Sequence, residues 1–397
     1  MNIKGSGRYR GRITASLTAM ALVCTGVSGQ ITASAEKDAV LAVDPSGKEK
    51  SYSAVLYDNT NGLPTSEAND IIETPDGFLW MGSYSGLVRY DGNSFERIDS
   101  TTGVTSVVDL FVDSKERLWI GTNDSGAVVM ENGRYVRFSK SDGLRSLSVR
   151  SITEDSRGNI YLATTRGVVL VDKDLQVQAV DYPELDDEYI RSVDTGADDV
   201  VYGVTIEGDV FTMKNGSVTD FRTSEELGID DLYSIMPDPD APGYLYIGNK
   251  HSEIYYGSIE SGFSSDDVTD VSPLSYINYM DMIDGDLWVC ADNGIGYINS
   301  ENGSVRQIEN IPMNTSVDSM TTDYQGNLWF VSSNQGVMKI VPNQFNDIYE
   351  KYGLTREVVY TTCMYEDKLF IGTKNSGLTV LDGNGIVKKM PLKSSVS

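Results

Sequence analysis

The stretch ANDIIETPDGFLWMGSYSGLVRYDGNSFERID, residues 68–99, decides the fold. Its apolar runs are short and rich in Ile, Leu, Val and Tyr, and Gly, Asn and Asp separate them, which is the pattern of strands joined by tight turns. We expect four strands, at residues 70–74, 78–82, 86–90 and 95–98, with hairpin turns at PDG (75–77) and DGN (91–93). No segment of the chain shows a sustained helical period, so the sequence predicts almost no helix.

Seven further copies of this stretch follow along the chain. Each has an aromatic residue near the end of an apolar run, then a small residue, a turn and a second apolar run, as in RLWIGTNDSGAVVMENG (117–133). The aromatic residues are 39, 42, 41, 44, 42, 41 and 41 positions apart, a regularity typical of repeat architectures. Four strands in every 40 to 45 residues or so (about one propeller blade) favour an all-β propeller over a stacked solenoid, whose strands would recur at shorter intervals. We expect the aromatic residues to pack between neighbouring sheets as structural anchors; they are Trp80, Trp119, Tyr161, Tyr202, Tyr246, Trp288, Trp329 and Phe370.

A lone predicted strand, YSAVLY (52–57), precedes the first full copy. It matches the fourth strand of later copies, such as YVRF (135–138). A displaced fourth strand would pair with the last blade and remove that blade's exposed edge. We therefore expect four-stranded blades arranged as a seven-bladed propeller over residues 51–350, closed by this N-terminal strand. One extra blade, residues 351–397, would begin a second propeller in a longer parent protein; an eight-bladed ring is the alternative.

The first 35 residues differ in composition from the rest. Residues 1–12 hold four basic residues and no acidic one, residues 13–27 are mildly apolar, and Ala33-Ser34-Ala35 forms an A-x-A pattern before Glu36. This order predicts a secretory signal peptide over residues 1–35, followed by a polar lead-in over residues 36–50. The alternatives are an uncleaved membrane anchor and a lipoprotein modified at Cys24. We expect export to the extracellular or periplasmic side, with membrane tethering in a longer parent protein.

Charge and cysteine content narrow the partners. The formal net charge of −26 at pH 7 argues against nucleic acid and against contact of the propeller with an anionic membrane. Beyond residue 35 the chain has Cys290 and Cys363, in predicted strands of different blades, and we expect two buried free thiols. We predict no metal and no cofactor, because the acidic turns, such as residues 238–240, lack the spacing of a calcium loop.

The segment NGLPTSEANDIIETPDGFLWMGSYSGLVRYDGNSFERI (61–98) resembles the two-component regulator propeller repeat. That pattern is a GL dipeptide, a strand ending in an acidic residue, a G-x-LW-h-G-T core, and then GL and YDG. LWIGT (118–122) and LFIGTKNSGL (369–378) keep the core, and the resemblance covers roughly residues 50–390. The middle copies depart from it at residues 202–204 and 246–248, and the fifth copy carries an insertion, PDPDAPG (237–243).

The resemblance implies a role in signalling. Such propellers are the extracytoplasmic ligand-binding sensor part of bacterial transmembrane signalling proteins, often followed by an immunoglobulin-like domain, a membrane helix and a histidine kinase or diguanylate cyclase. The sequence shows no kinase, nucleotide-loop or cyclase motif, so we expect no enzyme activity of this chain itself. The expected partners are an unknown small molecule or glycan and downstream transmembrane signalling domains.

Two sets of polar residues are candidates for ligand binding at the mouth of the central channel. The first lies ten residues before each anchor, on the predicted innermost strand, with Ser234 replacing it in the fifth copy and Tyr360 in the eighth. The alternative for this set is that small polar groups only cap the strand and bind water. Its other members are Asp70, Asp109, Ser151, Ser192, Asn278 and Ser319.

The second set lies in the loops between the second and third strands of each copy, which vary as recognition loops do. It consists of Tyr84, Asn123, Arg166, Glu207, His251, Asn293 and Asn334. Two other functions remain open. One is a protein-interaction scaffold, and the other is a propeller enzyme like the streptogramin and polysaccharide lyases, in which His251 with Arg166 or Tyr84 would supply the base and the charge stabiliser.

Overall fold

The computed structural model describes residues 40–42, 51–99, 102–178, 182–183, 185–264, 267–300, 302–343, 352–365, 368–382 and 385–391. The predicted signal peptide lies outside these residues. The chain divides into a larger unit, residues 1–42 with 52–341, and a smaller unit, residues 43–51 with 342–397. Among the described residues the helices are η2 (Lys140–Asp142) and α1 (Ser224–Leu227), which confirms the prediction of almost no helix. Neither is long and apolar enough to span a membrane.

The described strands of the larger unit form seven antiparallel sheets, six of them built from four consecutive strands as the repeat predicts. The first sheet consists of β3 (Asp70–Glu73), β4 (Leu79–Ser83), β5 (Gly86–Tyr90) and β6 (Phe95–Arg97), and the second of β7 (Val107–Val112), β8 (Leu118–Thr122), β9 (Ala127–Glu131) and β10 (Arg134–Phe138). The third sheet consists of β11 (Val149–Glu154), β12 (Ile160–Thr164), β13 (Gly167–Val171) and β14 (Val177–Gln178), and the fourth of β15 (Ile190–Thr195), β16 (Val201–Thr205), β17 (Val210–Lys214) and β18 (Ser217–Arg222).

The remaining sheets follow the same plan, except that the seventh takes strands from both ends of the larger unit. They consist of β19 (Leu232–Pro237), β20 (Leu245–Asn249), β21 (Glu253–Gly257) and β22 (Val268–Asp270); β23 (Ile277–Ile283), β24 (Asp286–Ala291), β25 (Gly294–Ile298) and β26 (Val305–Gln307); β27 (Ser319–Thr322), β28 (Leu328–Ser332) and β29 (Gly336–Asn343) with β2 (Ser51–Tyr57) and β1 (Val40–Ala42).

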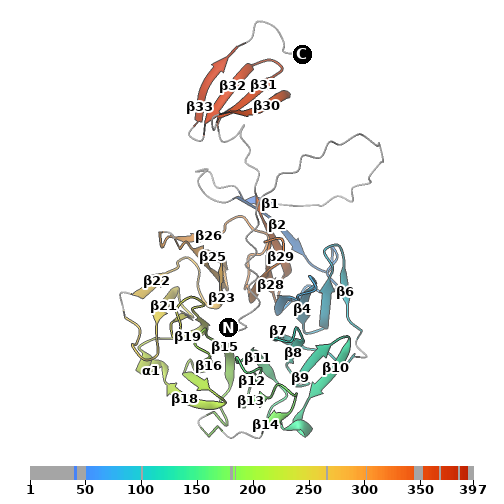
Figure 1. Ribbon diagram of the computed structural model, residues 1–397, viewed down its shortest axis with the longest axis vertical. Helices are drawn as coiled ribbons and strands as arrows, with labels where there is room; N and C mark the ends of the chain where they lie inside the picture. The colour runs from blue at the N-terminus through green and yellow to red at the C-terminus, as the bar shows by residue number, and fades with distance from the viewer. Residues whose placement is uncertain are drawn as a thin grey trace. The chain divides into compact units, whose positions relative to one another are not determined.

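The seven sheets of the larger unit are the blades of a closed ring. The first strand of each blade contacts the first strand of the next, and β27 of the seventh blade contacts β3 of the first. Figure 1 shows these first strands nearest the centre, with β6, β10, β18, β22 and β26 at the periphery. The predicted all-β propeller of four-stranded blades is therefore confirmed.

The anchoring aromatic residues tie each blade to its own first hairpin. Trp119 is fully buried, and its Nε1 donates to Oδ2 of Asp113 at 2.8 Å. Oδ1 of the same carboxylate accepts the amides of Lys115 and Arg117, which shapes the turn. Because the third and seventh blades repeat this arrangement, with Tyr161 on Asp155 and Trp329 on Asp323, the acidic residues of these turns have a structural role. Among the eight predicted anchors, Tyr246 and Phe370 are only partly buried.

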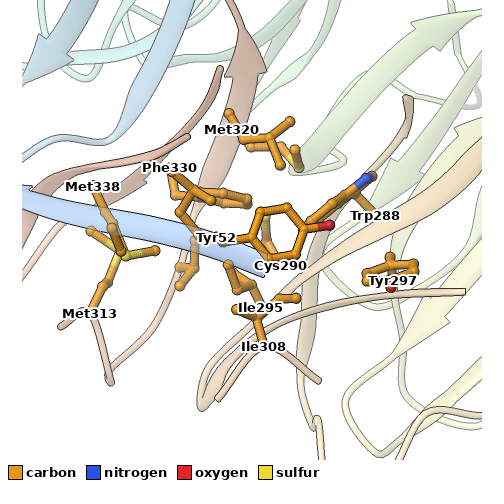
Figure 2. Close-up of a cluster of buried hydrophobic side chains, with 14 residues drawn as sticks. Tyr52, Trp288, Cys290, Ile295, Tyr297, Ile308, Met313, Met320, Phe330 and Met338 are labelled. Carbon is orange, nitrogen blue, oxygen red and sulfur yellow. The ribbon is translucent and has the colours of Figure 1, made fainter. Parts of the chain in front are cut away.

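The N-terminal strand closes the ring as the sequence predicts, since β2 pairs with β29 as the fourth strand of the seventh blade. Tyr52 and Ala54 of β2 are buried in a cluster with Trp288, Cys290 and Phe330 of the sixth and seventh blades, and Figure 2 shows Tyr52 among these side chains. The lead-in predicted to be polar departs from expectation at residues 40–42. They form β1, which pairs with the outer edge of β2.

Hydrogen bonds between blades repeat around the ring and include the junction between the seventh and first blades. In the second blade, the amide and hydroxyl of Ser114 donate to Glu154 of the third blade at 2.7 and 2.8 Å. In the seventh blade, the amide of Tyr324 donates to Glu73 of the first blade at 2.9 Å. The closing junction therefore uses the same contact as an internal one.

The smaller unit contains one four-stranded sheet among its described residues, formed by β30 (Val359–Tyr365), β31 (Lys368–Thr373), β32 (Gly377–Asp382) and β33 (Gly385–Met390). All seven residues of the edge strand β30 are exposed. Cys363 lies on this strand, so the prediction that it is buried is wrong; the prediction is right for Cys290, which is buried in the larger unit.

Candidate functional site

One face of the ring gathers the loops that vary between blades. Each innermost strand begins at this face, and the loop between the second and third strands of each blade returns to it. Backbone hydrogen bonds join the two kinds of segment, as in Ser106 N to Tyr84 O at 3.0 Å and Lys250 N to Asp231 O at 2.9 Å. We call this the loop face; the first hairpin of each blade lies at the opposite end, the hairpin face.

The polar residues predicted on the innermost strands mainly join neighbouring blades. Asp70 is buried; its Oδ2 accepts the amide of Leu110 from the second blade at 2.7 Å, and its Oδ1 accepts the hydroxyl of Ser319 from the seventh at 2.6 Å. The hydroxyl of Ser151 bonds in the same way to the backbone of Val193 in the fourth blade. At these three positions the structure supplies protein partners in neighbouring blades, a structural role that differs from the strand capping and water binding stated as the alternative above.

This placement changes what Asp70→Ala should do. We expect it to lower the free energy of unfolding by about 1–3 kcal/mol, because the buried Leu110 amide loses its acceptor. Urea denaturation of the full chain measures this loss. Asp109→Ala is the comparison, because Asp109 occupies the same register position but is only partly buried. Equal stability of wild type and Asp70→Ala would contradict the assignment.

The register of the innermost strands reveals a β-bulge that the sequence spacing missed. In the second to sixth blades the pairing of the first two strands skips one residue near the start of the innermost strand. In the sixth blade the skipped residue is Asn278, and Tyr279 takes the position equivalent to Asp109. The prediction that Asn278 is equivalent to Asp109 is therefore wrong. Tyr360 in the smaller unit is skipped in the same way, and Thr361 is the equivalent residue.

Five blades carry a residue at the bulge position, and a bulge re-aims the side chain that it carries. In the first and seventh blades the corresponding residues, Asn69 and Asp318, directly precede the innermost strand. Some bond within the protein: the side-chain amide of Asn69 donates to Val107 O at 2.7 Å, and that of Asn278 donates to Val317 O at 3.1 Å. The chemistry at this position differs from blade to blade. In ring order the residues are Asn69, Val108, Arg150, Arg191, Tyr233, Asn278 and Asp318.

Arg191, Tyr233 and Tyr276 form a contact series across the fourth, fifth and sixth blades. The guanidinium carbon of Arg191 lies 3.8 Å from the centroid of the Tyr233 ring, a cation–π contact. The Tyr233 ring meets the Tyr276 ring edge-on, with centroids 4.7 Å apart. Burial raises the pKa of the Tyr233 phenol, while Arg191 lowers it in part, so this phenol is neutral at pH 7. We call these three residues the Arg–Tyr sector.

Tyr276 is held by its backbone in this position. Its φ of 60° is unusual for a bulky residue. Its amide donates to His251 O at 2.8 Å, and its carbonyl accepts the amide of Asp292. Strained backbone of this kind persists where the surroundings fix it, and it is concentrated at binding sites.

Arg150 extends the series into the third blade. It occupies the bulge position one blade before Arg191, its guanidinium lies 6.0 Å from the centroid of the Tyr189 ring, and one of its nitrogens donates to Asn123 Oδ1 at 3.3 Å. Asn123, a predicted loop residue, thus contacts Arg150.

The other predicted loop residues have separate surroundings. The side chain of Asn293 bonds to the backbone of Ser275 and Pro273 and so shapes its own loop. Arg166 forms an exposed ion pair with Asp187, and His251 lies 3.2 Å from Asp231 with most of its side chain exposed. Tyr84 is 54% exposed. These contacts do not join His251, Arg166 and Tyr84 into one constellation.

Two acidic residues, Asp292 and Asp318, lie at the loop face in the sixth and seventh blades. Oδ1 of Asp292 accepts the side-chain amide of Asn278 at 2.9 Å and the hydroxyl of Ser316 at 2.8 Å. Asp318 accepts the amide of Ser333 at 2.6 Å. Burial, with Asp292 nearby, raises the pKa of Asp318, although the bonds from Ser333 and Ser316 oppose the shift.

The raised pKa of Asp318 predicts a pH dependence of stability. A carboxyl with a higher pKa in the folded protein stabilises the fold fully below its unfolded pKa of about 3.9, and this contribution is lost as the pH rises through the folded pKa. Relative to wild type, Asp318→Asn should therefore gain stability as the pH rises from about 3 to 7. Urea denaturation at several pH values tests this, and a stability difference that falls with pH would contradict it.

Sequence comparison between the blades could have found the Arg–Tyr sector. The predicted position is small and polar in most blades, whereas the residue just before it changes from amide to aliphatic, arginine, tyrosine and acid. Positions with similar residues in most blades support the shared scaffold. Positions whose residues differ between blades are the candidates for a role specific to one part of the ring.

Residues 62–85 and 143–166 match the family model described as two component regulator propeller. Both matches span an innermost strand, the first hairpin and the second strand of a blade, so the predicted family resemblance is confirmed at these repeats. No curated protein matches the sequence.

Solved structures share the fold. The chain resembles the extracellular domain of a putative hybrid two component system from B. thetaiotaomicron, with 22% identity and a TM-score of 0.60 over 87% of this chain and 50% of that one. A second such domain from the same organism shows 16% identity and a TM-score of 0.57 over 87% and 48% of the chains. A streptogramin B lyase shows 16% identity and a TM-score of 0.62 over 74% and 98%. The chain spans about half the length of both extracellular domains.

Proposed function

Since this chain carries repeats of the two component regulator propeller family, we propose that it is the extracytoplasmic ligand-binding sensor of a signal-transduction protein. Its output would be a histidine kinase or a diguanylate cyclase in the parent protein. The shared fold with extracellular domains of putative two component systems supports this role, and the N-terminal composition supports export. The ligand would be a small molecule or a glycan, and this chain would have no catalytic role.

One observation carries the location of the site. Asp70, Ser151 and Ser319 of the innermost strands bond between blades. The residues one position earlier are of five types in the seven blades and lie where the innermost strands begin, at the loop face. Among them, Arg191 and Tyr233 contact each other and Tyr276 through charge and ring faces. Ligand sites combine aromatic surface with a few placed polar groups in this manner.

A ligand screen tests the proposal. We expect a small metabolite or glycan to raise the unfolding temperature of the full chain. Binding stabilises the folded state by about 2.7 kcal/mol at a ligand concentration of a hundred times the Kd. The variant with Tyr233→Ala and Tyr276→Ala should lose this shift. Tyr324→Ala is the matched control, because Tyr324 is 74% exposed and lies in a first hairpin, on the hairpin face.

Each other outcome identifies an alternative. A ligand that stabilises the double tyrosine variant as well as wild type would place the site elsewhere and overturn the location. A protein partner without any small-molecule ligand would favour the interaction scaffold. Chemical conversion of a ligand, abolished in His251→Ala, would favour the lyase alternative that the streptogramin B lyase fold raises.

A further inference from the structure

Two buried polar atoms beside Tyr233 lack hydrogen-bond partners. Among the described residues, three buried side-chain nitrogen or oxygen atoms have none: Nε of Arg191, Oγ of Ser234 and one Nη of Arg117. The first two lie on neighbouring innermost strands, β15 and β19, at the Arg–Tyr sector. Arg191 covers the ring of Tyr233, and Ser234 is the next residue along the strand.

These atoms define the chemistry of a suitable ligand group. The Nε–H of arginine can only donate, and a serine hydroxyl can donate or accept, so an oxygen acceptor suits either atom. Leaving such groups buried without a partner is costly, and bonds to a charged acceptor recover the most. The planar guanidinium of arginine matches the geometry of a carboxylate better than the compact ammonium of lysine does.

The surrounding charges favour one orientation of a bound ligand. Arg150 occupies the same bulge position in the preceding blade, so two cations stand side by side in ring order on a chain of net charge −26. In ring order the next blade after Tyr233 holds Asp292, whose negative charge acts on the Tyr233 phenol. An anionic group is therefore favoured next to Arg191 and disfavoured next to Asp292.

The tyrosines supply the surface for the rest of the ligand. Tyr233 and Tyr276 are only partly buried and meet edge-on at 4.7 Å, a contact that covers a face of one ring only. Arg191 covers one face of Tyr233, so a sugar ring or an aromatic ring would contact the remaining faces. We propose that the Arg–Tyr sector binds a small ring compound that carries a carboxylate, with the carboxylate on Arg191 and Ser234 and the ring against Tyr233 and Tyr276. This proposal rests on the sensor function and its location above.

Matched probe pairs test the ligand class. D-glucuronate and D-glucose differ by a carboxylate on a sugar ring, and benzoate and benzyl alcohol differ in the same way on an aromatic ring. Binding of each probe to the full chain is followed by calorimetry at low salt and at high salt. We expect the acid of at least one pair to bind with millimolar affinity and its neutral partner to bind at least tenfold more weakly, because a hydrogen bond to a charged group contributes about tenfold or more in affinity. High salt should weaken the binding of the acid. The pair that responds distinguishes sugar acids from aromatic acids.

Variants connect that binding to the sector. Arg191→Gln should weaken the binding of the acid by about tenfold or more. Asp292→Asn should strengthen the binding of the acid, because a nearby like charge is removed. Arg222→Gln is the matched control, an arginine of the same blade that lies on its outer strand β18, is 47% exposed in its side chain and is paired with Asp220. Urea denaturation establishes that each variant folds.

The outcomes separate the ligand class from the sensor function. Equal binding of acid and neutral partner, or unchanged binding in Arg191→Gln, overturns the carboxylate proposal. Failure of all four probes also overturns it. In each case, a ligand from the wider screen that depends on Tyr233 and Tyr276 would still support the sensor site, whereas a ligand independent of them would overturn both.

Discussion

Replacing Trp119 with alanine is expected to lower the free energy of unfolding of the propeller by about 3–5 kcal/mol. Trp119 is fully buried in a cluster that joins the second blade to the third and includes Phe138, Val149 and Leu162. Its ring stacks on Phe138 with centroids 5.4 Å apart. The substitution removes both this packing and the hydrogen bond to the fully buried Asp113.

Urea denaturation followed by tryptophan-independent circular dichroism measures the effect. Trp119→Phe separates its two parts, since phenylalanine keeps most of the packing and loses the bond to Asp113, a loss of about 1–3 kcal/mol. Tyr324→Ala, at an exposed residue, should stay within about 0.5 kcal/mol of wild type. A loss well under 1 kcal/mol or so for Trp119→Ala would show that this indole does not join the two blades.

The second large effect concerns the closing strand. Ala54 on β2 is fully buried among residues of the sixth and seventh blades. Ala54→Asp places a carboxyl in this apolar cluster. We expect a loss of about 3–5 kcal/mol, the usual consequence of an uncompensated buried charge.

Ser53→Asp is the matched control for this variant. Successive side chains of a strand point to opposite faces, and Ser53 is only partly buried, so the same charge should cost much less there. Chemical denaturation of both variants gives the comparison. Equal and small losses would mean that the ring does not depend on β2 for its stability.

The fold was predictable because its signals are local and repeated. Each Trp or Tyr anchor recurs at a near-constant spacing, and each first hairpin carries its own acidic or glycine turn residues. The fourth strand of the seventh blade was predictable for the same reason, since YSAVLY repeats the pattern of a fourth strand without a preceding third.

The candidate site was less predictable because its geometry depends on pairing. The first hairpin of the sixth blade is one residue shorter than that of the second, since Asp281 lies opposite Trp288 but Phe111 lies opposite Trp119. A fixed count from the anchor therefore identifies Asp109 correctly but identifies Asn278 in place of Tyr279. The partners of Asp70 come from the second and seventh blades, which flank the first blade in the ring, and no local sequence pattern predicts these contacts. The exposure of Cys363 likewise follows from the edge position of β30 rather than from its apolar sequence.

The pairing of β2 with β29 also sets the order in which the propeller folds. The two strands come from opposite ends of the larger unit, so their meeting closes the longest loop in that unit, at an entropic cost that grows with loop length. Contacts of such long sequence separation form slowly. Until they form, β29 presents an unpaired edge that can recruit a strand from another molecule. The blades between them can assemble from local hairpins first, and the ring becomes a single cooperative structure only when its two ends have met.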